Sequence, residues 1–359
     1  MIQDYNDEEL RARVKLFGNL LGQVLLKQAG PKVFDAVETL RTGYIELRKN
    51  DNPKLRKRLH KLIERLDPNT LAQVVRAFSI YFSLSNIAEE SFQHWQRKQQ
   101  VRQGGPLWIG SFDHTLREFH AQGMTADQLQ QMLNKLHFLP VLTAHPTQSK
   151  RRTVLQLLRR IFLTAEELHA AQSNNLARDA IIRDLETQIQ ILWKTDEVRG
   201  RKMPVRDEIK YGLFYFQRSL FRAVPTMYRY LDQAIERVYA AEIKDSNFKT
   251  PTFLQFGSWI GGDRDGNANV KPETTVNAVH LHNRTVLRMY CRIVSSLGRR
   301  LTFCASLCSV TEALLTSIAQ DTKACDPETT RTLSRFESEP YRHKLYFMRH
   351  RLNCNLKRV

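Results

Sequence analysis

Two short runs of strand-forming residues interrupt a chain whose apolar residues otherwise recur at helical spacing. The first run covers residues 137–144 and predicts one buried strand. The second run covers residues 252–260, and each run leads into a polar loop. Only 15 glycines and 12 prolines occur in 359 residues, which favours long helices over many short strands joined by turns. Two strands do not make a closed sheet, so the sequence predicts a mainly α-helical chain with an incomplete α/β part.

Turn-forming residues divide the helical segments from one another. Gly30-Pro31 ends a first helix, and the run Asn50-Asp51-Asn52-Pro53 ends a second segment at 32–49. Further helices are predicted at about 54–66, 69–98, 125–136, 149–172, 176–201, 205–243 and from 273 onward. The linker Gln103-Gly104-Gly105-Pro106 is the clearest candidate boundary between domains in the first half of the chain.

The chain is strongly basic. Its 55 Lys and Arg residues against 37 Asp and Glu residues leave a formal charge of +18. Such a balance suits a nucleic-acid binder, because basic side chains release counterions from phosphates. The cations are spread over most of the chain, however, and no zinc finger, RNP motif or glycine-rich arm accompanies them. An acidic remainder of the molecule outside this chain is a second explanation.

Composition and cysteine usage predict the compartment. Hydrophobic residues make up 42% of the chain, enough for a real core, and no apolar run approaches the roughly 20 residues that span a bilayer. The acidic, polar N-terminus predicts no signal peptide. Five cysteines without a CxxC pattern predict neither a disulfide framework nor a zinc site. We therefore expect a soluble, reduced, cytoplasmic protein that does not bind a membrane.

The loop after the first strand run combines one histidine with a group of cations. His145 is the only titratable residue between Phe138 and Thr147, and Lys150, Arg151 and Arg152 follow it. Cations at a helix N-terminus oppose the macrodipole, so three together indicate a bound anion. They would also lower the pKa of His145 and keep it neutral, the form that a general base requires. The alternatives are a solvated basic face and a structural histidine.

The second loop, residues 257–267, holds four glycines and three charged residues. Its glycine spacing does not fit a calcium loop. We expect a tight turn in which Asp263 and Asp265 orient Arg264 by ion pairing, with Trp259 as an apolar wall. The alternative is a purely structural turn. A third segment, residues 192–201, has alternating charges that are typical of a solvated helix face, and its spacing alone suggests no function.

Three motifs together resemble phosphoenolpyruvate carboxylase, in particular its bacterial type. VLTAHPTQSKRR (141–152) is similar to the first signature of that family, SWIGGDRDGN (258–267) to a second block, and LWKTDEVR (192–199) to a third, with Lys194 where Arg is more usual. The segments 10–25 and 339–345 are also similar and come in the same order. The resemblance covers nearly the whole chain up to Leu352, after which the ending suggests a frame change or a premature stop.

The resemblance implies a helix-rich (β/α)8 barrel of the TIM type, of which this chain resembles only the N-terminal portion. Family members are more than twice as long. The expected organisation is therefore a helical region at 1–105 and a partial barrel at 106–359 that carries the TAHPT and GGDRDGN motifs. Half a barrel leaves strand edges unpaired, which predicts poor solubility of the chain by itself.

The resemblance also implies a reaction and residue roles. Such enzymes convert phosphoenolpyruvate and bicarbonate into oxaloacetate and phosphate with Mg²⁺ or Mn²⁺, which feeds the tricarboxylic acid cycle. His145 matches the family's general base on carboxyphosphate, and Trp259 and Arg264 match positions of the active-site region. Four arginines match a sugar-phosphate activator site of plant members: Arg151, Arg152, Arg199 and Arg342. The alternative for a bacterial member is a structural cluster.

The metal carboxylates, the catalytic lysine and the second histidine of the family are expected outside this chain. The chain alone is therefore predicted to bind no metal and to be inactive, and the family's homotetramer is expected of the full-length enzyme only. The alternative function is a non-catalytic basic helical remnant that binds anions or nucleic acid. Nucleic acid is the weaker expectation, because the best-clustered cations coincide with the carboxylase motif.

Overall fold

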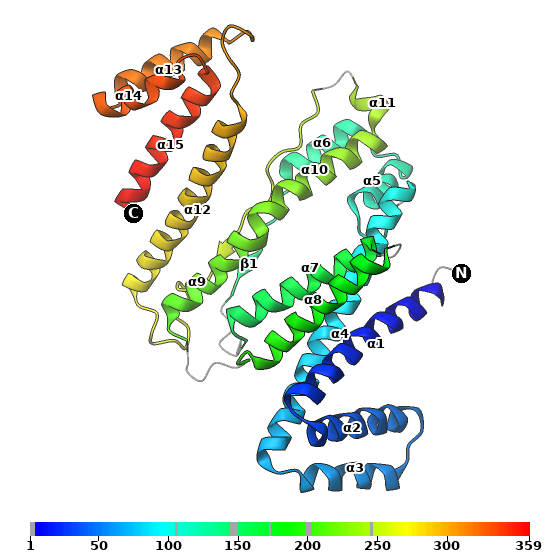
Figure 1. Ribbon diagram of the computed structural model, residues 1–359. Helices are drawn as coiled ribbons and strands as arrows, with labels where there is room; N and C mark the ends of the chain where they lie inside the picture. The colour runs from blue at the N-terminus through cyan, green and yellow to red at the C-terminus, as the bar shows by residue number, and fades with distance from the viewer. Residues whose placement is uncertain (1–3, 105–106, 144–149, 172–173, 198–202, 245–246) are drawn as a thin grey trace. The chain divides into compact units, whose positions relative to one another are not determined.

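The computed structural model describes residues 4–104, 107–143, 150–171, 174–197, 203–244 and 247–359, and it is mostly helical (Figure 1). The chain forms two compact units. Unit 1 comprises Met1–Ala121 and Thr147–Lys202, and unit 2 comprises Gln122–Pro146 and Met203–Val359. These packing units differ from the sequence division at residue 105, because helices beyond that point return to the N-terminal helices. The division at 105 stays a prediction about domains.

Unit 1 is an all-helical bundle. Its helices are α1 (Asp4–Gln28), α2 (Pro31–Lys49), α3 (Pro53–Arg65), α4 (Pro68–Gln103), α5 (Phe112–Ala121), α7 (Arg152–Ala170) and α8 (Asn175–Lys194). The long α4 packs against α1, α2 and α7, and α7 packs against α8 (Figure 1). Leu84 of α4, Ile161 of α7 and Ile189 of α8 are fully buried in one shared core. The apolar stripes predicted from the sequence therefore face one another.

The predicted helix boundaries in unit 1 are confirmed where turn residues set them. Gly30 has a φ of +86°, and Pro31 begins α2 immediately after it. The Asn52 side chain accepts hydrogen bonds from the first amides of α3. Asp67 caps α4 by accepting from the backbone N–H of Thr70 at 3.0 Å. Caps of this kind satisfy amides that have no partner inside the helix.

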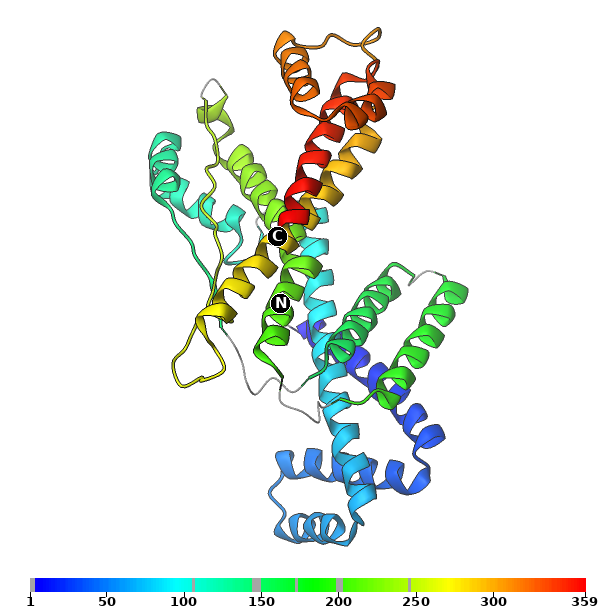
Figure 2. The ribbon, with the colours of Figure 1, turned by 90° about the vertical axis from the view of Figure 1, so that its left-hand side faces the viewer.

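Unit 2 contains the strands and the remaining helices. Its elements are α6 (Ala126–Lys135), β1 (Val141–Leu142), α9 (Val205–Tyr215), the π-helical turn η1 (Phe216–Leu220), α10 (Phe221–Val238), α11 (Ala240–Ile243), β2 (Gly257–Ser258), α12 (Pro272–Arg300), α13 (Glu312–Ala324), α14 (Pro327–Leu333), the 3-10 turn η2 (Ser334–Phe336) and α15 (Pro340–Arg358). The helices α12 and α15 run side by side, and α13 also packs on α15 (Figure 2).

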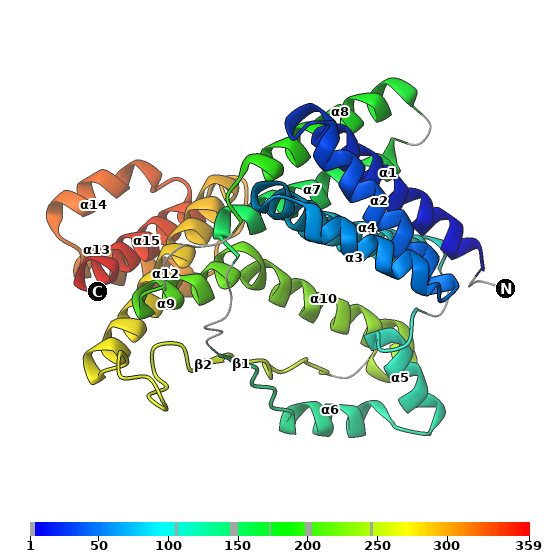
Figure 3. The same cartoon turned by 90° about the horizontal axis from the view of Figure 1, so that it is seen from below.

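The two predicted strand runs pair with each other in parallel (Figure 3). Val141 lies opposite Gly257 and Leu142 opposite Ser258, and a further bridge joins Phe138 to Leu254. The expectation that the first run is buried is wrong, because Phe138 is 57% exposed and Val141 is 40% exposed. Among the described residues this is a two-stranded sheet, so the barrel stays an expectation from the resemblance.

Two segments predicted to be helical are divided into shorter helices in the structure. The segment 205–243 is interrupted by η1 and by a break at Tyr239, and the segment after 273 is interrupted by the loop 301–311. A π-helical turn differs from an α-helical turn by one residue, so apolar periodicity does not reveal it. The loop 301–311 reverses the chain so that α15 returns along α12.

Candidate functional site

The carboxyl ends of β1 and β2 lie at the same edge, because the strands are parallel. The backbone N–H of Trp259, the first residue after β2, donates to the carbonyl oxygen of Leu142 at 2.8 Å. The loops that follow both strands therefore begin side by side. His145 follows β1 by three positions and lies outside the described residues, so its predicted role stays a prediction.

The loop after β2 is shaped by its own backbone. The amides of Gly262 and Asp263 both donate to the carbonyl oxygen of Trp259 at 2.9 Å. Gly261 has a φ of +82°, a conformation that favours glycine. The hydroxyl of Thr275 on α12 donates to the carbonyl oxygen of Gly261 at 3.1 Å and ties the loop to that helix.

A small apolar cluster holds the base of this loop. Ile260 packs with Ile209 and Leu213 of α9 and with Ala278 of α12, and all four are buried. Gly212 of α9 leaves room for Ile260, since a Cβ atom there would lie 2.8 Å from the Ile260 Cδ1 atom. The loop therefore starts from a fixed position between two helices.

The side chains expected to act from this loop face solvent. Trp259 is 58% exposed, and Arg264 is also exposed. The prediction that Arg264 forms ion pairs with its two neighbouring aspartates is wrong. Among the described residues, Arg264 pairs with neither of them. Instead the Asp263 carboxylate accepts from the backbone N–H of Asp265 at 3.0 Å, and this Asx turn occupies the group that was expected to hold Arg264. The active-site roles of Trp259 and Arg264 stay predictions.

The cation triplet lies in unit 1 and begins outside the helix. Helix α7 starts at Arg152 with Arg151 as its N-cap, so the prediction that all three cations lie in the first helical turn is wrong. The Arg151 guanidinium lies 3.5 Å from the Asp196 carboxylate, and the Lys150 Nζ atom donates to the Ser83 hydroxyl at 3.2 Å. Asp196 therefore offers Arg151 an opposite charge, and Ser83 accepts a hydrogen bond from Lys150, with both cations placed before the first helical residue.

The segment after α8, to which the spacing gave no function, is held by α4. Arg76 donates to the carbonyl oxygen of Thr195 and lies over the Trp193 ring at 5.4 Å. The Ser79 hydroxyl donates to the Glu197 carboxylate at 2.7 Å. These α4 residues were missed from the sequence. The available signal is the spacing of Arg76, Ser79 and Ser83, which places them on one helix face.

The four arginines of the expected activator site are distributed over both units. Arg151 and Arg152 lie together in unit 1, Arg342 lies in the first turn of α15 in unit 2, and Arg199 lies outside the described residues. Arg342 donates to the Glu339 carboxylate at 2.9 Å, which raises its pKa, and it lies over the Phe336 ring at 4.5 Å. The activator role of these arginines stays a prediction.

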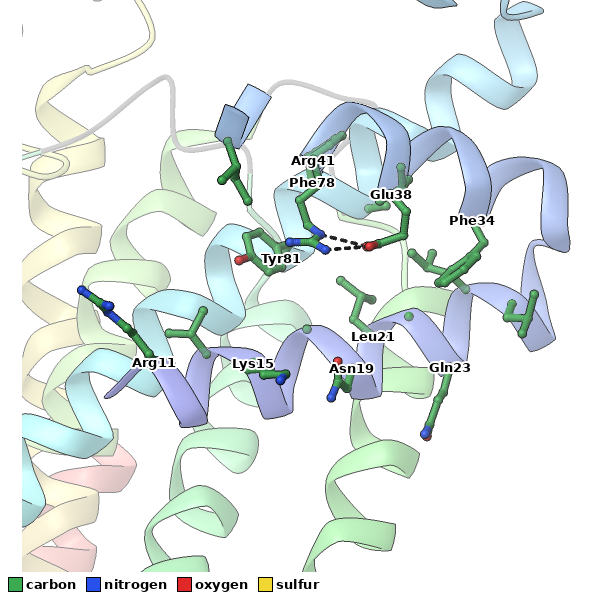
Figure 4. Close-up of a pocket in the computed structure, with 18 of the residues that line it drawn as sticks. Arg11, Lys15, Asn19, Leu21, Gln23, Phe34, Glu38, Arg41, Phe78 and Tyr81 are labelled. Carbon is green, nitrogen blue, oxygen red and sulfur yellow. Dashed lines mark hydrogen bonds and ion pairs between the residues drawn. The ribbon is translucent and has the colours of Figure 1, made fainter. Parts of the chain in front are cut away.

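A groove of about 890 Å³ lies elsewhere in unit 1, between α1, α2 and α4 (Figure 4). Leu21, Phe34 and Tyr81 line it, and Arg41 pairs with Glu38 beside it at 2.7–2.9 Å. None of the described candidate residues lines this groove.

No group of three or more His, Cys, Asp or Glu residues in the described ranges could hold a metal ion. None of the described helices combines the length and apolar character that crossing a membrane requires.

The described residues define a mainly α-helical protein with one small parallel sheet, whose two strands lead into polar loops. The sequence profile of phosphoenolpyruvate carboxylase matches residues 10–359 of this chain. The chain belongs to the phosphoenolpyruvate carboxylase family, a family of lyases.

Curated relatives agree with this assignment. Phosphoenolpyruvate carboxylase from Roseiflexus castenholzii is 33% identical over 353 residues, which cover 97% of this chain and 37% of the relative. The enzyme from Paraburkholderia xenovorans is 32% identical over 98% of this chain and 34% of its own length. That from Methylorubrum extorquens is 34% identical over 81% of this chain and 31% of its own length. The chain thus spans about a third of these relatives.

Proposed function

We propose that this chain is the N-terminal portion of a phosphoenolpyruvate carboxylase and contributes the base of its active site. The supporting observation is the tie between Trp259 and Leu142, which brings the starts of the two motif-bearing loops together. The complete enzyme would form oxaloacetate and phosphate from phosphoenolpyruvate and bicarbonate. The neutral imidazole of His145 would take the proton of carboxyphosphate, so that carbon dioxide is released beside the enolate.

Residues of the second loop would shape the same site. The backbone turn around Gly261 and the apolar cluster under Ile260 would hold Trp259 as a wall that limits access of water. Arg264, which has no carboxylate partner among the described residues, would be available to a phosphate or carboxylate group of the substrate. The described residues do not fit a metal ion, so Mg²⁺ or Mn²⁺ is proposed for the complete enzyme only.

The basic residues before α7 would bind an anionic effector. Arg151 and Asp196 are 41% and 71% exposed and 3.5 Å apart, a geometry in which an ion pair stabilises little. A phosphate group could therefore displace Asp196 at low cost. We extend this proposal to Arg152, Arg199 and Arg342. A cytoplasmic homotetramer is proposed for the complete enzyme.

The isolated chain is expected to form no oxaloacetate. The proposed base lies in this chain, but stabilisation of an enolate requires electrophilic groups that its described residues do not assemble. The measurement is a malate-dehydrogenase-coupled assay with phosphoenolpyruvate, bicarbonate and Mg²⁺. Bicarbonate-dependent oxaloacetate formation above the enzyme-free rate would contradict the expected inactivity.

A chimera tests the same proposal by an expected gain of carboxylase activity. Residues 10–352 would replace the matching part of the Roseiflexus castenholzii relative, and carboxylase activity is expected. His145→Asn in the chimera should lower kcat by about 10²–10⁴-fold, the usual contribution of a general base. His137→Asn is the control, since His137 is an exposed histidine before the same strand. A chimera in which both substitutions have the same effect would contradict the role of His145.

Nucleic-acid binding is the second candidate, and helix α3 supports it. Helical spacing places five cations on one face of this helix: Lys54, Lys57, Arg58, Lys61 and Arg65. All are exposed, and within the described residues none forms an ion pair. Such a stripe is suited to polyanions. Helix α3 contains no Phe, Tyr or Trp, so it provides no platform on which bases could stack.

We expect no retention of the chain on double-stranded DNA above about 0.1 M salt, because screening at that strength removes weak surface attraction. The check is a salt titration by fluorescence anisotropy. Lys57→Gln with Lys61→Gln is compared with Lys357→Gln and Arg358→Gln, exposed residues of α15. If the chain is retained at higher salt, and only the two α3 substitutions weaken that retention, nucleic-acid binding would be favoured over the carboxylase proposal.

A further inference from the structure

The loop between α12 and α13 carries two cysteines four residues apart. The amides of Leu307 and Cys308 both donate to the carbonyl oxygen of Cys304, at 3.0 and 3.2 Å. These bonds close a single helix-like turn, and residues four apart in such a turn project on the same side. The Cys308 thiol lies 3.2 Å from the same carbonyl oxygen. The two sulfur atoms are therefore held on one side of the loop.

This turn faces solvent and is attached near the start of α15. Leu307 is 87% exposed and Phe303 is 53% exposed, while both cysteines are half-buried free thiols. The backbone N–H of Ala305 donates to the carbonyl oxygen of Ser338 at 2.9 Å, which anchors the turn near the start of α15. A small oxidant can reach the sulfur atoms without any opening of the core.

We propose that Cys304 and Cys308 form a redox-active dithiol that a hydroperoxide converts into an intramolecular disulfide. Cα atoms four apart in a helical turn are about 6 Å apart, within the 4.4–6.8 Å range of disulfides. The Cβ atoms, about 5–6 Å apart in such a turn, must approach by about 1–2 Å. The turn belongs to a loop and not to a helix, so it can tighten without breaking a helical ladder.

Cys304 is the attacking residue. The Ser306 hydroxyl lies 3.1 Å from the Cys304 sulfur, and hydrogen bonds from the Ser306 side chain and backbone lower the pKa of this thiol. The thiolate is the nucleophile towards peroxides. The Cys308 thiol donates a hydrogen bond to the carbonyl oxygen of Cys304, which keeps its sulfur beside the attacking residue, and Cys308 is the resolving residue.

The reaction balances without a metal or a further cofactor. The Cys304 thiolate attacks one peroxide oxygen, the O–O bond breaks, and the leaving alkoxide or hydroxide takes up a proton. The product is a sulfenic acid at Cys304. The Cys308 sulfur, having lost its proton, then attacks the Cys304 sulfur, the S–O bond breaks, and water leaves. Two thiols and one hydroperoxide yield one disulfide, one alcohol or water molecule, and one water molecule.

The other three cysteines are internal controls. Cys291 donates to the Asn353 side chain at 3.4 Å, and Cys354 contacts His350 at 3.4 Å. Burial and neighbouring carboxylates raise the pKa of Cys325, which slows its oxidation. Tryptic cleavage after Arg300 and Lys323 gives one peptide with both loop cysteines and none of the other three.

The test is mass spectrometry of the full chain after brief treatment with hydrogen peroxide and alkylation of remaining thiols. The peptide 301–323 is expected to lose two hydrogens, reversibly with dithiothreitol, at least about tenfold faster than Cys325 is oxidised. Cys308→Ser should instead trap a sulfenic acid at Cys304 that dimedone labels. Cys304→Ser should abolish both products, and Cys354→Ser should change neither.

Two results would overturn the proposal. One is oxidation of Cys325 or Cys354 before the loop pair. The other is a Cys304 that forms mixed disulfides or overoxidised products while Cys308 stays alkylated. All substituted positions except Cys354 lie in the exposed loop, and circular dichroism of each variant checks that the helices are retained.

Discussion

Replacing Gly261 by alanine is expected to destabilise unit 2 by about 3 kcal/mol. At a φ of +82° an L-residue costs about 1–2 kcal/mol in backbone strain. In addition, a Cβ atom at this position would lie 2.7 Å from the Ile209 Cδ1 atom, 2.9 Å from its Cγ1 atom and 3.2 Å from the Ala278 Cβ atom. Such contacts force α9 and α12 apart at the base of the motif-bearing loop.

A second glycine in the same loop separates the two effects. Gly266 also has a positive φ, of +63°, but a Cβ atom there would meet no other atom within 4 Å. Gly266→Ala should therefore cost only the backbone strain, about 1–2 kcal/mol. Both variants replace glycine by alanine at a positive φ. The difference between their losses of stability therefore measures the packing of α9 against α12.

Hydrogen exchange of α9 and α12 amides is the suitable measurement, because it reports the stability of this region independently of unit 1. Protection in Gly261→Ala should fall by about a hundredfold, and in Gly266→Ala by about tenfold. Equal losses in the two variants would mean that the close contact with Ile209 does not constrain the loop, and the proposed fixed base for Trp259 would fail with it.

Local sequence signals predicted much of this fold because short-range physics sets it. Gly30 and Pro31 end one helix and begin the next, and Asn52 caps α3, as their conformational preferences require. The two strand runs also pair as a parallel ladder at the predicted positions. Each of these features depends on residues within a few positions of one another, or on a strong β-forming run.

The errors came from partners distant in the sequence. Apolar residues at 137–144 predicted burial, yet Phe138 and Val141 stay exposed because the described strands pair only with each other. The triplet ending at Arg152 was expected inside a helix, but Asp196 lies beside Arg151 and the helix begins one position later. Periodicity and charge counts contain no information on such partners.

The candidate site also combines a feature that the sequence predicted with one that it did not predict. The alternation of glycine and charge at 257–267 predicted a tight turn, and backbone hydrogen bonds around Gly261 form it. The orientation of Arg264 was not predictable, because an Asx turn at Asp263 competes for the same carboxylate. The assignment of a reaction to these loops came from the resemblance, and the family match over residues 10–359 supports the family and not the individual roles.

Replacing Asp321 by alanine is expected to release α13 from α15, at a cost of about 3–5 kcal/mol. The Asp321 side chain is only 7% exposed and lies between two cations of α15. Its carboxylate accepts from the Lys344 Nζ atom at 2.7 Å and also pairs with Arg351. Removal leaves Lys344, itself 19% exposed, as a largely buried charge without its carboxylate.

The same helix offers a matched control. Glu312 is an exposed carboxylate in the first turn of α13, where it faces no described cation partner, so Glu312→Ala should change the stability by less than about 0.5 kcal/mol. Lys344→Met in the Asp321→Ala background should recover stability, because it removes the unpaired charge while retaining the apolar stem.

Exchange of α13 amides and thermal unfolding by circular dichroism would follow these variants. Recovery in the double variant would show that the penalty comes from an uncompensated ammonium group and not from lost packing. If the Asp321→Ala chain is as stable as the Glu312→Ala control, the apolar cluster of Leu333, Phe336 and Phe347 holds α13 against α15 without the ion pairs.

The loop that carries Cys304 and Cys308 joins α12 to α13. The Asp321→Ala variant therefore also tests whether the loop dithiol depends on the packing of α13 against α15.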